Sequence, residues 1–433
     1  MSAYYFRLAW HGLRKAPWLS SLMVLTLAVG IASSVTTNAL RYMLARNPMP
    51  DKAALLLSVQ DPSMPTHMGN LLSFPVVQQL GKLGKDLGRY AYTGLGIDVE
   101  AMRPDSPLKH VKVGIRYTTR TFFAMFDVPV HAGRVWTQAE QTEHAPVAVL
   151  ARSLAEQLFP GEDALGETVL IGHRAYTVIG IAADWDPKPR FYNLQHPAGP
   201  FGGGGFGISV PVTTIDLAPS TMKYQISCPN GEFGMPEPKD IIKRGCSWFS
   251  AWYLANSPQD ALRLRRLLEA RLPEIMPARQ ARKIAILDVS QIIDMADLVP
   301  GSVRVYALLG LAFLTLCVVN AGGMQISRVL RSREQIGIRR AMGASRWEIV
   351  KQFLFDALLI GSVGGFLGMA LTFVSFLMVR KFLDTGYANM AQMNVVVFMA
   401  MIALVLVCSL LVGVVPAWLA SLENPAKTIK SAQ

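Results

Sequence analysis

The residue types that most often carry out chemistry are present in this chain, but their spacing matches no common catalytic or metal-binding motif. The seven histidines are scattered and make no His-Glu-x-x-His zinc pair, and there is no Cys-x-x-Cys. A Gly-x-Ser-x-Gly nucleophile elbow is also missing. The glycine run at 202–205 lacks the Lys and Ser/Thr that must follow in a phosphate-binding loop. We therefore expect no intrinsic catalytic centre, no bound metal and no cofactor in this chain.

Two pairs of residues in the polar middle of the chain are candidates for specific bonds. Cys228 and Cys246 flank a glycine- and proline-rich stretch. Closing a loop of this size stabilises a fold by about 3 kcal/mol in the chain-entropy model. We predict a disulfide between them, and two free thiols are the alternative. Asp184 and Asp186 resemble a carboxylate pair, but they precede prolines, so we expect an exposed turn there.

A third group of candidates is a basic segment at 328–356, between two apolar runs. Its basic residues are Arg328, Arg331, Arg333, Arg339, Arg340, Arg346 and Lys351. Arginines form forked hydrogen bonds with the carboxylates of a partner, and Glu334 could receive a basic residue in return. Gly337 and Gly343 allow a turn or the close approach of another backbone. The alternative is that the arginines only fix membrane topology and bind lipid, and the residue types alone leave both open.

The elements that carry these groups are predicted from the distribution of apolar residues. Hydrophobic residues make up 51% of the 433 residues and charged residues 17%, with a mean hydropathy of +0.30. This balance excludes a mostly disordered chain and argues against a single soluble domain. Uncharged runs of about 20 residues can cross a bilayer, and we predict four such helices at 18–40, 305–327, 357–379 and 393–416. A cleaved signal peptide is the alternative for the first run, which is longer than such peptides.

The fold class that follows is an α-helical membrane protein with four transmembrane helices and a large α+β domain inserted between the first and second spans. Basic residues collect at both chain ends and at 328–356, so we place these parts in the cytoplasm. We place 41–304 and the short loop 380–392 on the periplasmic side. The net charge of +12 then reflects orientation in the lipid bilayer and needs no nucleic-acid partner. Residues 1–17 are expected to form an amphipathic helix on the membrane surface, and 417–433 a cytoplasmic tail.

The inserted region mixes strand and helix patterns. Strand patterns occur at 111–117, 146–150 and 167–182, and helical spacing at 152–159 and 258–272. Ser257 is expected to cap the second of these helices. We predict a core formed by 50–184 and 251–290. Residues 185–250 are rich in glycine and proline, and we expect a long loop or an insert with weak regular structure there.

Small residues mark one face of the third predicted span. Gly361, Gly364, Gly365 and Gly368 give two Gly-x-x-x-Gly spacings. Glycines at this spacing let helices approach closely in lipid. We expect them to pack against the fourth span or another neighbouring helix, and a substrate groove is the alternative. Cys317 and Cys408 lie inside predicted spans and are expected to act as small packing residues.

The basic segment resembles the connection after the second span in permeases of the MacB/FtsX-type (type VII) ABC transporter superfamily. The resemblance is carried by Gly-Ile-Arg-Arg-Ala-Met-Gly-Ala at 337–344, after an Arg/Glu stretch. Other segments that agree with the family pattern are 24–31, 122–123, 133–134, 147–150, 176–181, Asn320 and 424–426. The match covers roughly 1–48, 111–184 and 305–430. Residues 185–250 do not resemble the family.

The resemblance implies a partner and a mechanism. In this family two permeases form a dimer and dock on a cytoplasmic ABC ATPase dimer that binds ATP and Mg²⁺. The ATPase moves the outer domains through helix extensions, which is called mechanotransmission. The residues that the resemblance assigns to ATPase coupling are Arg333, Glu334, Gly337, Arg339, Arg340, Gly343, Ala344 and Arg346. Because the chain shows no ATPase motif, the family implies a separate ATPase and a second permease subunit, with a heterodimer favoured over a homodimer.

The function implied by the resemblance is export or extraction of a substrate at a bacterial inner membrane, with no reaction catalysed by this chain itself. Drugs, peptides, siderophores and lipoproteins are all open as substrates, and a periplasmic adaptor and an outer-membrane channel are further partners in the family. One alternative is a regulatory complex that activates a periplasmic enzyme such as a cell-wall hydrolase. Another is a stand-alone receptor or adhesin, which would leave the three spans after the outer domain unexplained.

Overall fold

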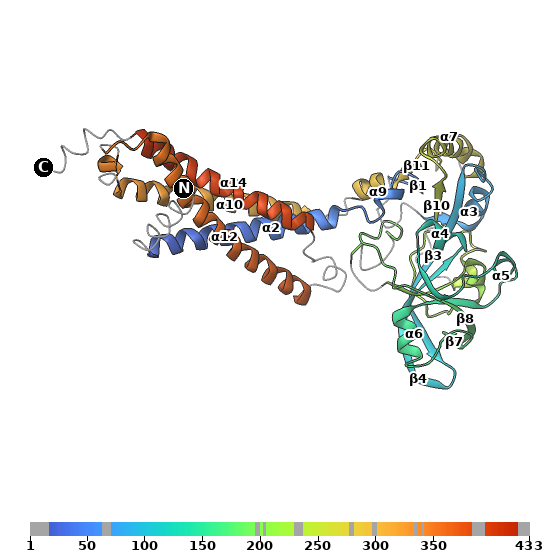
Figure 1. The fold of residues 1–433 in the computed structure, drawn as a ribbon. Coiled ribbons are helices and arrows are strands. Elements are labelled where there is room, and N and C mark those ends of the chain that lie inside the picture. The colour runs from blue at the N-terminus through green and yellow to red at the C-terminus, as the bar shows by residue number, and fades with distance from the viewer. Residues whose placement is uncertain are drawn as a thin grey trace. The chain divides into compact units, whose positions relative to one another are not determined.

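The computed structural model describes residues 17–62, 71–194, 200–201, 205–228, 237–276, 281–296, 301–332, 336–339, 342–382 and 395–422. The chain forms two compact units, Met1–Ala45 together with Val299–Gln433, and Arg46–Leu298. We call the first unit the helical bundle. We call the second the inserted domain, because it lies in the chain between the first two long helices of the bundle (Figure 1).

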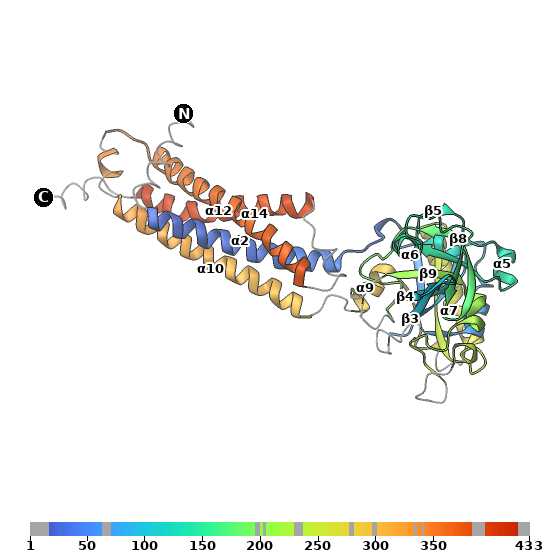
Figure 2. The ribbon, with the colours of Figure 1, turned by 90° about the horizontal axis from the view of Figure 1, so that it is seen from below.

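The described part of the helical bundle has four long helices, α2 (Pro17–Ala45), α10 (Gly301–Arg331), α12 (Arg346–Phe382) and α14 (Val395–Leu422). Each contains a stretch that is long and apolar enough to cross a membrane. The helices lie side by side in both views (Figures 1 and 2). Each of the four helices is longer at one or both ends than the membrane span predicted for it. The surface helix predicted at 1–17 falls, up to residue 16, outside the described residues, as do 383–394 and 423–433.

Apolar side chains fill the interior of the bundle and also cover its outside. The buried set includes Met23, Leu27 and Ile31 of α2, Leu314 and Ala321 of α10, Ile360 and Phe376 of α12, and Met401 and Val412 of α14. Large apolar side chains also point outward, such as Leu308 at 65% exposure and Phe366 at 72%. An outer surface of this kind is favourable in lipid and unfavourable in water, which fits helices that cross a membrane.

The inserted domain is built on one mixed sheet. Its strands are β1 (Leu56–Gln60), β2 (Leu72–Ser73), β3 (Gly88–Arg103), β4 (Ser106–Thr118), β5 (Val130–Gly133), β6 (Val147–Ala151), β7 (Thr168–Ile171), β8 (Arg174–Ala182), β9 (Phe206–Pro211), β10 (Ser247–Ala255) and β11 (Ala285–Asp288). The order is β11-β1-β10-β3-β4-β9-β6-β8-β5, with β2 on β10 and β7 on both β3 and β8. The pairs β4–β9 and β6–β8 are parallel and the other described pairs are antiparallel.

Six of these strands close into a ring. The pairings run from β3 to β4, β9, β6, β8 and β7, and β7 returns to β3. Closure pairs strand edges that would otherwise be free.

The predicted fold class, four apolar helices with a large domain of strands and helices between the first and the second, is confirmed.

Short helices cover the sheet. They are η1 (Pro50–Lys52), α3 (Phe74–Leu80), α4 (Thr121–Met125), α5 (Gln138–Thr142), α6 (Arg152–Leu158), η2 (Val212–Leu217), η3 (Pro238–Asp240), α7 (Pro258–Ile275) and α9 (Val289–Met295). The predicted helix at 258–272 is confirmed as α7. Its predicted cap is confirmed too, because the Asp260 amide donates to Ser257 Oγ at 3.1 Å. Leu264, Leu268 and Leu272 form its buried face.

The stretch 185–250 is not the weakly structured insert that its composition predicts. It contains β9, which lies between β4 and β6, and the start of β10, which lies between β1 and β3. Phe191 and Trp248 are completely buried. A disulfide joins Cys228 to Cys246, the pair favoured from the sequence, and Cys246 is buried in the core. The described part of this stretch therefore completes the sheet despite the glycine- and proline-rich composition.

Candidate functional site

Residues 332–345, between α10 and α12, include most of the positions that the sequence assigns to coupling, and we call them the connecting segment. Its described part has a helical turn at 336–339. Ser345 Oγ accepts a hydrogen bond from the Glu348 amide at 3.2 Å, and Glu348 Oε2 accepts one from the Ser345 amide at 2.8 Å. This reciprocal cap fixes where α12 begins. Gly343 has a φ of +100°, a backbone conformation that side chains other than glycine rarely adopt, so it makes the turn before α12.

An apolar contact anchors the connecting segment to the bundle. Ile336 is 5% exposed and packs in a small cluster with Val329 of α10, Ile349 and Phe353 of α12, and Ala417 of α14. The cluster therefore joins the segment to three helices. Burial of an isoleucine side chain contributes about 1.5–3 kcal/mol, which is enough to hold a short segment in one orientation.

A polar contact reinforces the anchor. The guanidinium of Arg339 donates a hydrogen bond from Nη1 to Gln352 Oε1 of α12 at 2.7 Å. The Ala344 amide donates to the carbonyl of Arg339 at 3.0 Å and closes the turn. Arg339 is half-buried, so at least part of this arginine serves the internal fold of the segment instead of facing outward.

Large apolar side chains are exposed in the segment and in the first turn of α12. Ile338 is 50% exposed, Met342 76% and Trp347 63%. Ile338 and Met342 are four residues apart, and the Met342 amide donates to the Ile338 carbonyl at 3.0 Å. Lys351 Nζ lies 5.7 Å from the centre of the Trp347 ring, within cation–π range. We call the exposed side chains of Ile338, Met342 and Trp347 the apolar patch.

The coupling residues predicted from the sequence fall into three sets. Arg333, Glu334 and Arg340 lie outside the described residues. Gly337 and Arg339 face the bundle, since Gly337 is buried. Gly343 and Arg346 are exposed, and Ala344 is half-buried. The predicted coupling residues are charged or small, and none of them belongs to the apolar patch. The i, i+4 spacing of Ile338 and Met342 in an otherwise polar segment was the signal that could have revealed it.

The four glycines of α12 lie at two different helix contacts. A Cβ on Gly361 would lie 2.7 Å from Ser409 Cβ, and one on Gly365 2.6 Å from Val405 Cγ1, both in α14. A Cβ on Gly364 would lie 3.3 Å from Leu27 Cβ, and one on Gly368 3.1 Å from the Ala28 carbonyl oxygen, both in α2. The two Gly-x-x-x-Gly faces thus let α12 fit closely between α14 and α2.

Asp186 is the centre of a charge cluster in the inserted domain. Its carboxylate accepts hydrogen bonds from Arg190 at 2.6 and 2.7 Å and from Tyr192 Oη at 2.9 Å, and lies 3.0 Å from Lys188 Nζ. Burial raises the pKa of this carboxyl, but Arg190 and Lys188 outweigh burial and hold the pKa below its usual value. Burial lowers the pKa of Lys188 to about 8. The predicted exposed turn is therefore wrong for Asp186, although Asp184 is exposed.

A further buried cation lies near this cluster. The guanidinium carbon of Arg116 in β4 is 4.6 Å from the centre of the Phe122 ring, 5.0 Å from Phe206, 5.2 Å from Trp185 and 5.7 Å from Tyr192. Burial lowers the pKa of Arg116 to about 10. The charged groups here are engaged by one another and by rings, which indicates a structural role. Within the described residues, no three His, Cys, Asp or Glu side chains gather in a way that would hold a metal ion.

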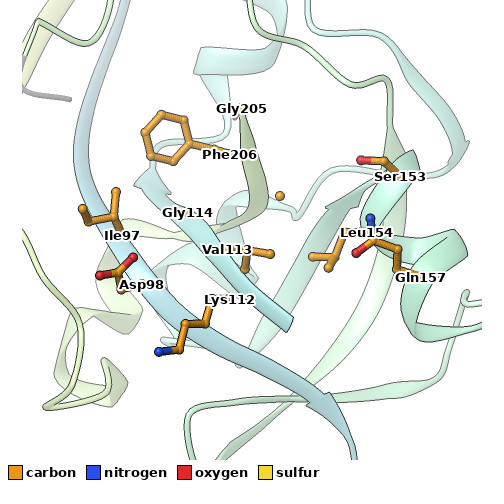
Figure 3. A pocket seen from close by; sticks show the side chains of 11 residues that line it. Ile97, Asp98, Lys112, Val113, Gly114, Ser153, Leu154, Gln157, Gly205 and Phe206 are labelled. Atoms are coloured by element: carbon orange, nitrogen blue, oxygen red, sulfur yellow. The ribbon is translucent and has the colours of Figure 1, made fainter. Parts of the chain in front are cut away.

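A cavity of about 370 Å³ opens in the inserted domain beside β4 (Figure 3). Ile97 and Asp98 of β3, Lys112 of β4 and Leu154 of α6 are among its lining residues. Asp98 Oδ2 accepts a hydrogen bond from Lys223 at 2.7 Å, and this bond lowers the pKa of Asp98. None of the lining residues is among the predicted coupling residues.

Comparison with protein families assigns both units. A family profile described as the MacB-like periplasmic core domain matches residues 20–232, and one described as the FtsX-like permease C-terminal domain matches residues 307–425. The second match includes the connecting segment. The chain belongs to the MacB/FtsX-type ABC transporter permeases. The family that the motif at 337–344 predicts is therefore confirmed.

Several curated proteins that are similar to this permease share one name. The chain is 26% identical over 305 residues to the macrolide export ATP-binding/permease protein MacB of Salmonella paratyphi A, covering 69% of this chain and 40% of the relative. It is 25% identical over 376 residues to the protein of the same name from Azoarcus sp., covering 84% of this chain and 50% of the relative. The permease thus spans half or less of the length of these relatives.

Two solved structures are also similar to the permease. One is the periplasmic region of MacB from Actinobacillus actinomycetemcomitans, with 14% identity and a TM-score of 0.38, covering 58% of this chain and 97% of that one. The other is the extracellular domain of the noncanonic ABC-type transporter YknZ from Gram-positive bacteria, with 11% identity and a TM-score of 0.36, covering 54% of this chain and 100% of that one.

Proposed function

We propose that this permease is the membrane subunit of an ABC transporter in a bacterial inner membrane and that a separate ATPase subunit docks on its connecting segment. The connecting segment and both chain ends face the cytoplasm, and the inserted domain faces the periplasm. The charges support this orientation, because Arg328, Arg331, Arg346 and Lys351 surround the connecting segment. The ATP-binding activity in the names of the curated relatives is supplied here by the partner, with ATP and Mg²⁺ bound there.

The observation that carries the proposal is the apolar patch on an anchored segment. Ile336 and Arg339 hold the segment against the bundle, so Ile338, Met342 and Trp347 are presented in one orientation. A preformed patch loses little conformational freedom when a partner binds, which favours affinity. The basic residues around the patch can bind carboxylates at the rim of the interface.

Two of the four helices, α10 and α2, are joined to the inserted domain in the chain and offer a route to it from the docked ATPase. α10 runs without a break from Gly301, next to the end of the inserted domain, to Arg331 at the connecting segment. α2 ends at Ala45, and the inserted domain follows it directly in the chain. Movement of the connecting segment therefore passes along rigid helices to the domain, which is mechanotransmission.

The permease works in a dimer, and we favour a heterodimer. Its cargo is exported or extracted on the outer side, and a macrolide, the compound in the names of the relatives, is one candidate.

Site-specific photo-crosslinking tests the docking surface. A benzophenone amino acid replaces Met342 in the full chain, in its native membrane, and the matched control carries it at Leu262, an apolar residue of α7 that is 58% exposed. We expect a crosslinked product at position 342 that is labelled by a photoreactive ATP analogue and identified by mass spectrometry as a nucleotide-binding subunit. Crosslinks only to lipid at position 342, or the same product at position 262, would exclude docking on the apolar patch.

A further inference from the structure

The cavity beside β4 lies where both strands that flank β4 contain an extra residue (Figure 3). Next to residues 113–115 of β4, β3 uses four residues where β4 uses three, and β9 uses three where β4 uses two. Such β-bulges interrupt the ladder of backbone hydrogen bonds and redirect the neighbouring side chains. Ile97, Asp98 and Gly207, the residues inside the two bulges, all line the cavity. The cavity is therefore a product of the strand register around β4.

The bulge in β3 is held by contacts outside the β3–β4 ladder. The backbone of Ile97 exchanges two hydrogen bonds with that of Lys223, at 2.8 and 3.0 Å. The Asp98 carboxylate accepts a further hydrogen bond from Lys223 Nζ at 2.7 Å. Asp98 has a φ of +57°, in the left-handed region that residues other than glycine seldom adopt. A backbone in this conformation persists only where the surrounding structure imposes it, so this wall of the cavity is preformed.

Apolar side chains and two glycines form another part of the wall. A Cβ on Gly114 would lie 2.8 Å from Phe206 Cδ1, so the Phe206 ring lies over β4 at this glycine. A Cβ on Gly207 would lie 3.1 Å from Leu154 Cδ2 of α6. Phe206, Leu154 and Val113 therefore offer a ring and branched hydrocarbon surface to a ligand. The volume of about 370 Å³ lies within the range of small-molecule sites, about 300–1,000 Å³.

The charges in the cavity favour an anionic ligand. Asp98, the acidic residue among those that line the cavity, is already bound by Lys223. Ser153 is also engaged, because its hydroxyl donates to Asp184 Oδ1 at 2.7 Å. Lys112 is exposed, and its side chain has no ion pair or hydrogen bond with any residue that the structure describes. The ammonium group of Lys112 is therefore available to the carboxylate of a ligand.

A second positive charge lies behind the wall. Arg116 is two residues beyond Gly114 and four beyond Lys112, so the three residues are on the same face of β4. The guanidinium carbon of Arg116 lies 5.0 Å from the centre of the Phe206 ring, which lines the cavity. Its Nε and Nη2 atoms have no hydrogen-bond partner in the described part of the chain. The charge of Arg116 therefore acts on the cavity through an apolar wall, where screening is weaker than in water.

We propose that this cavity binds an amphipathic anion, a molecule in which a carboxylate is attached to an aromatic or branched hydrocarbon body. The body lies against Phe206 and Leu154, and the carboxylate lies at Lys112. Arg116 keeps its structural position among the rings and contributes its charge without touching the ligand. The site consists of residues of the inserted domain alone, so the proposal does not depend on an ATPase partner or on the direction of transport.

Photolabelling of the full chain in lipid nanodiscs tests the site. The probe is 4-benzoylbenzoate, whose benzophenone body reacts with nearby C–H bonds when irradiated, and its methyl ester is the uncharged counterpart. We expect saturable labelling by the carboxylate in the peptides that contain Val113 and Leu154, identified by mass spectrometry. Lys112→Gln should raise the half-saturating concentration about tenfold, the usual effect of losing one hydrogen bond to a charged group, and the ester should need a similar excess. Lys112→Arg, which keeps the charge, should leave it unchanged.

Two tryptophan variants of α6 show whether the label depends on the cavity. Gln157→Trp places a large ring in the cavity from an exposed position and should abolish the labelling. Glu156→Trp adds the same ring at the neighbouring exposed position, which does not line the cavity, and should have no effect. If Gln157→Trp fails to fold, Lys112→Gln against Lys112→Arg still decides, because both change an exposed side chain. Equal labelling by acid and ester, labels confined to the helical bundle, or labelling that survives in folded Gln157→Trp would overturn the proposal.

Discussion

Gly365 of α12 lies so close to Val405 of α14 that a Cβ on the glycine would come within 2.6 Å of Val405 Cγ1. Real Cβ atoms do not approach another carbon this closely, so the two helices can pack as they do only because residue 365 has no side chain. Gly364, on the adjacent face, brings α12 to α2 in the same manner. Small residues thus determine the distances between these helices of the bundle.

Gly365→Ala should lower the stability of the bundle by about 1–3 kcal/mol, because the added methyl group overpacks the α12–α14 contact. Gly323→Ala in α10 is the matched control, since no atom lies within 4 Å of a Cβ built there. That control should be neutral or slightly stabilising, because alanine is the better helix former. Thermal unfolding of the full chain in detergent micelles measures both. Equal melting temperatures for the two variants would contradict the close contact.

Asp186→Asn should destabilise the inserted domain by about 3 kcal/mol, because it leaves the completely buried Arg190 without its carboxylate. We take the low end of the usual range, since the Asp186 side chain keeps 20% of its surface exposed. Asp105→Asn is the control. Asp105 binds Arg103 at 2.7 Å but is 64% exposed, so solvent screens the pair and the loss of stability should be much smaller than for Asp186→Asn. Chemical unfolding of the two variants would show whether the difference exists.

Breaking the Cys228–Cys246 disulfide should lower stability by about 3 kcal/mol, because the unfolded chain regains the freedom of the loop between them. Dithiothreitol should therefore lower the melting temperature of the unchanged chain and leave that of a Cys228→Ala, Cys246→Ala double variant as it is. Cys317 and Cys408 are free and buried, and they remain in both proteins. A shift of equal size in both proteins would show that the reductant acts elsewhere.

Acid should remove the stabilisation that Glu140 provides. Two hydrogen bonds from Arg134, each at 2.7 Å, and one from the Thr137 amide lower the pKa of Glu140 from 4.5 to about 2. The folded state therefore binds fewer protons than the unfolded state between these values. The contribution is complete above pH 4.5 and is lost as the pH falls towards 2. The difference in melting temperature between the unchanged chain and Glu140→Gln should be positive at pH 6 and shrink between pH 4.5 and 2. A constant difference would rule out this titration.

Local signals in the sequence predict local structure in this chain. Ser257 with the leucines of α7, and the uncharged runs of α2, α10, α12 and α14, each contain within one segment the information that forms the element. The connecting segment is similar, because its family pattern is continuous at 337–344. The pattern does not show which way each side chain of the segment points. Arg339, for example, contacts Gln352, which belongs to the helix that follows the segment.

Long-range contacts are what the sequence could not reveal. β9 forms in a glycine-rich stretch because β4 and β6 flank it, and neither neighbour is close in sequence. Asp186 is half-buried, because Arg190 and Tyr192 fold back onto its carboxylate and Gly205 lies against its side chain, so its turn-like neighbourhood in the sequence is misleading. Arg116 lies among rings from four separate positions, and no spacing along the chain reports such a cluster.

The measurement that tests the account most directly is quantitative co-purification of the full chain from its native membrane in gentle detergent. The unchanged chain should retain a nucleotide-binding subunit in stoichiometric amount. Met342→Asp should retain less than about a tenth of it, since a charge in the centre of an apolar interface costs more than 1.4 kcal/mol. Leu262→Asp, which alters an equally apolar exposed position in α7, should retain all of it. If the unchanged chain carries no ATPase where a known ABC complex survives, or if Met342→Asp carries as much as Leu262→Asp, the connecting segment is not the docking site.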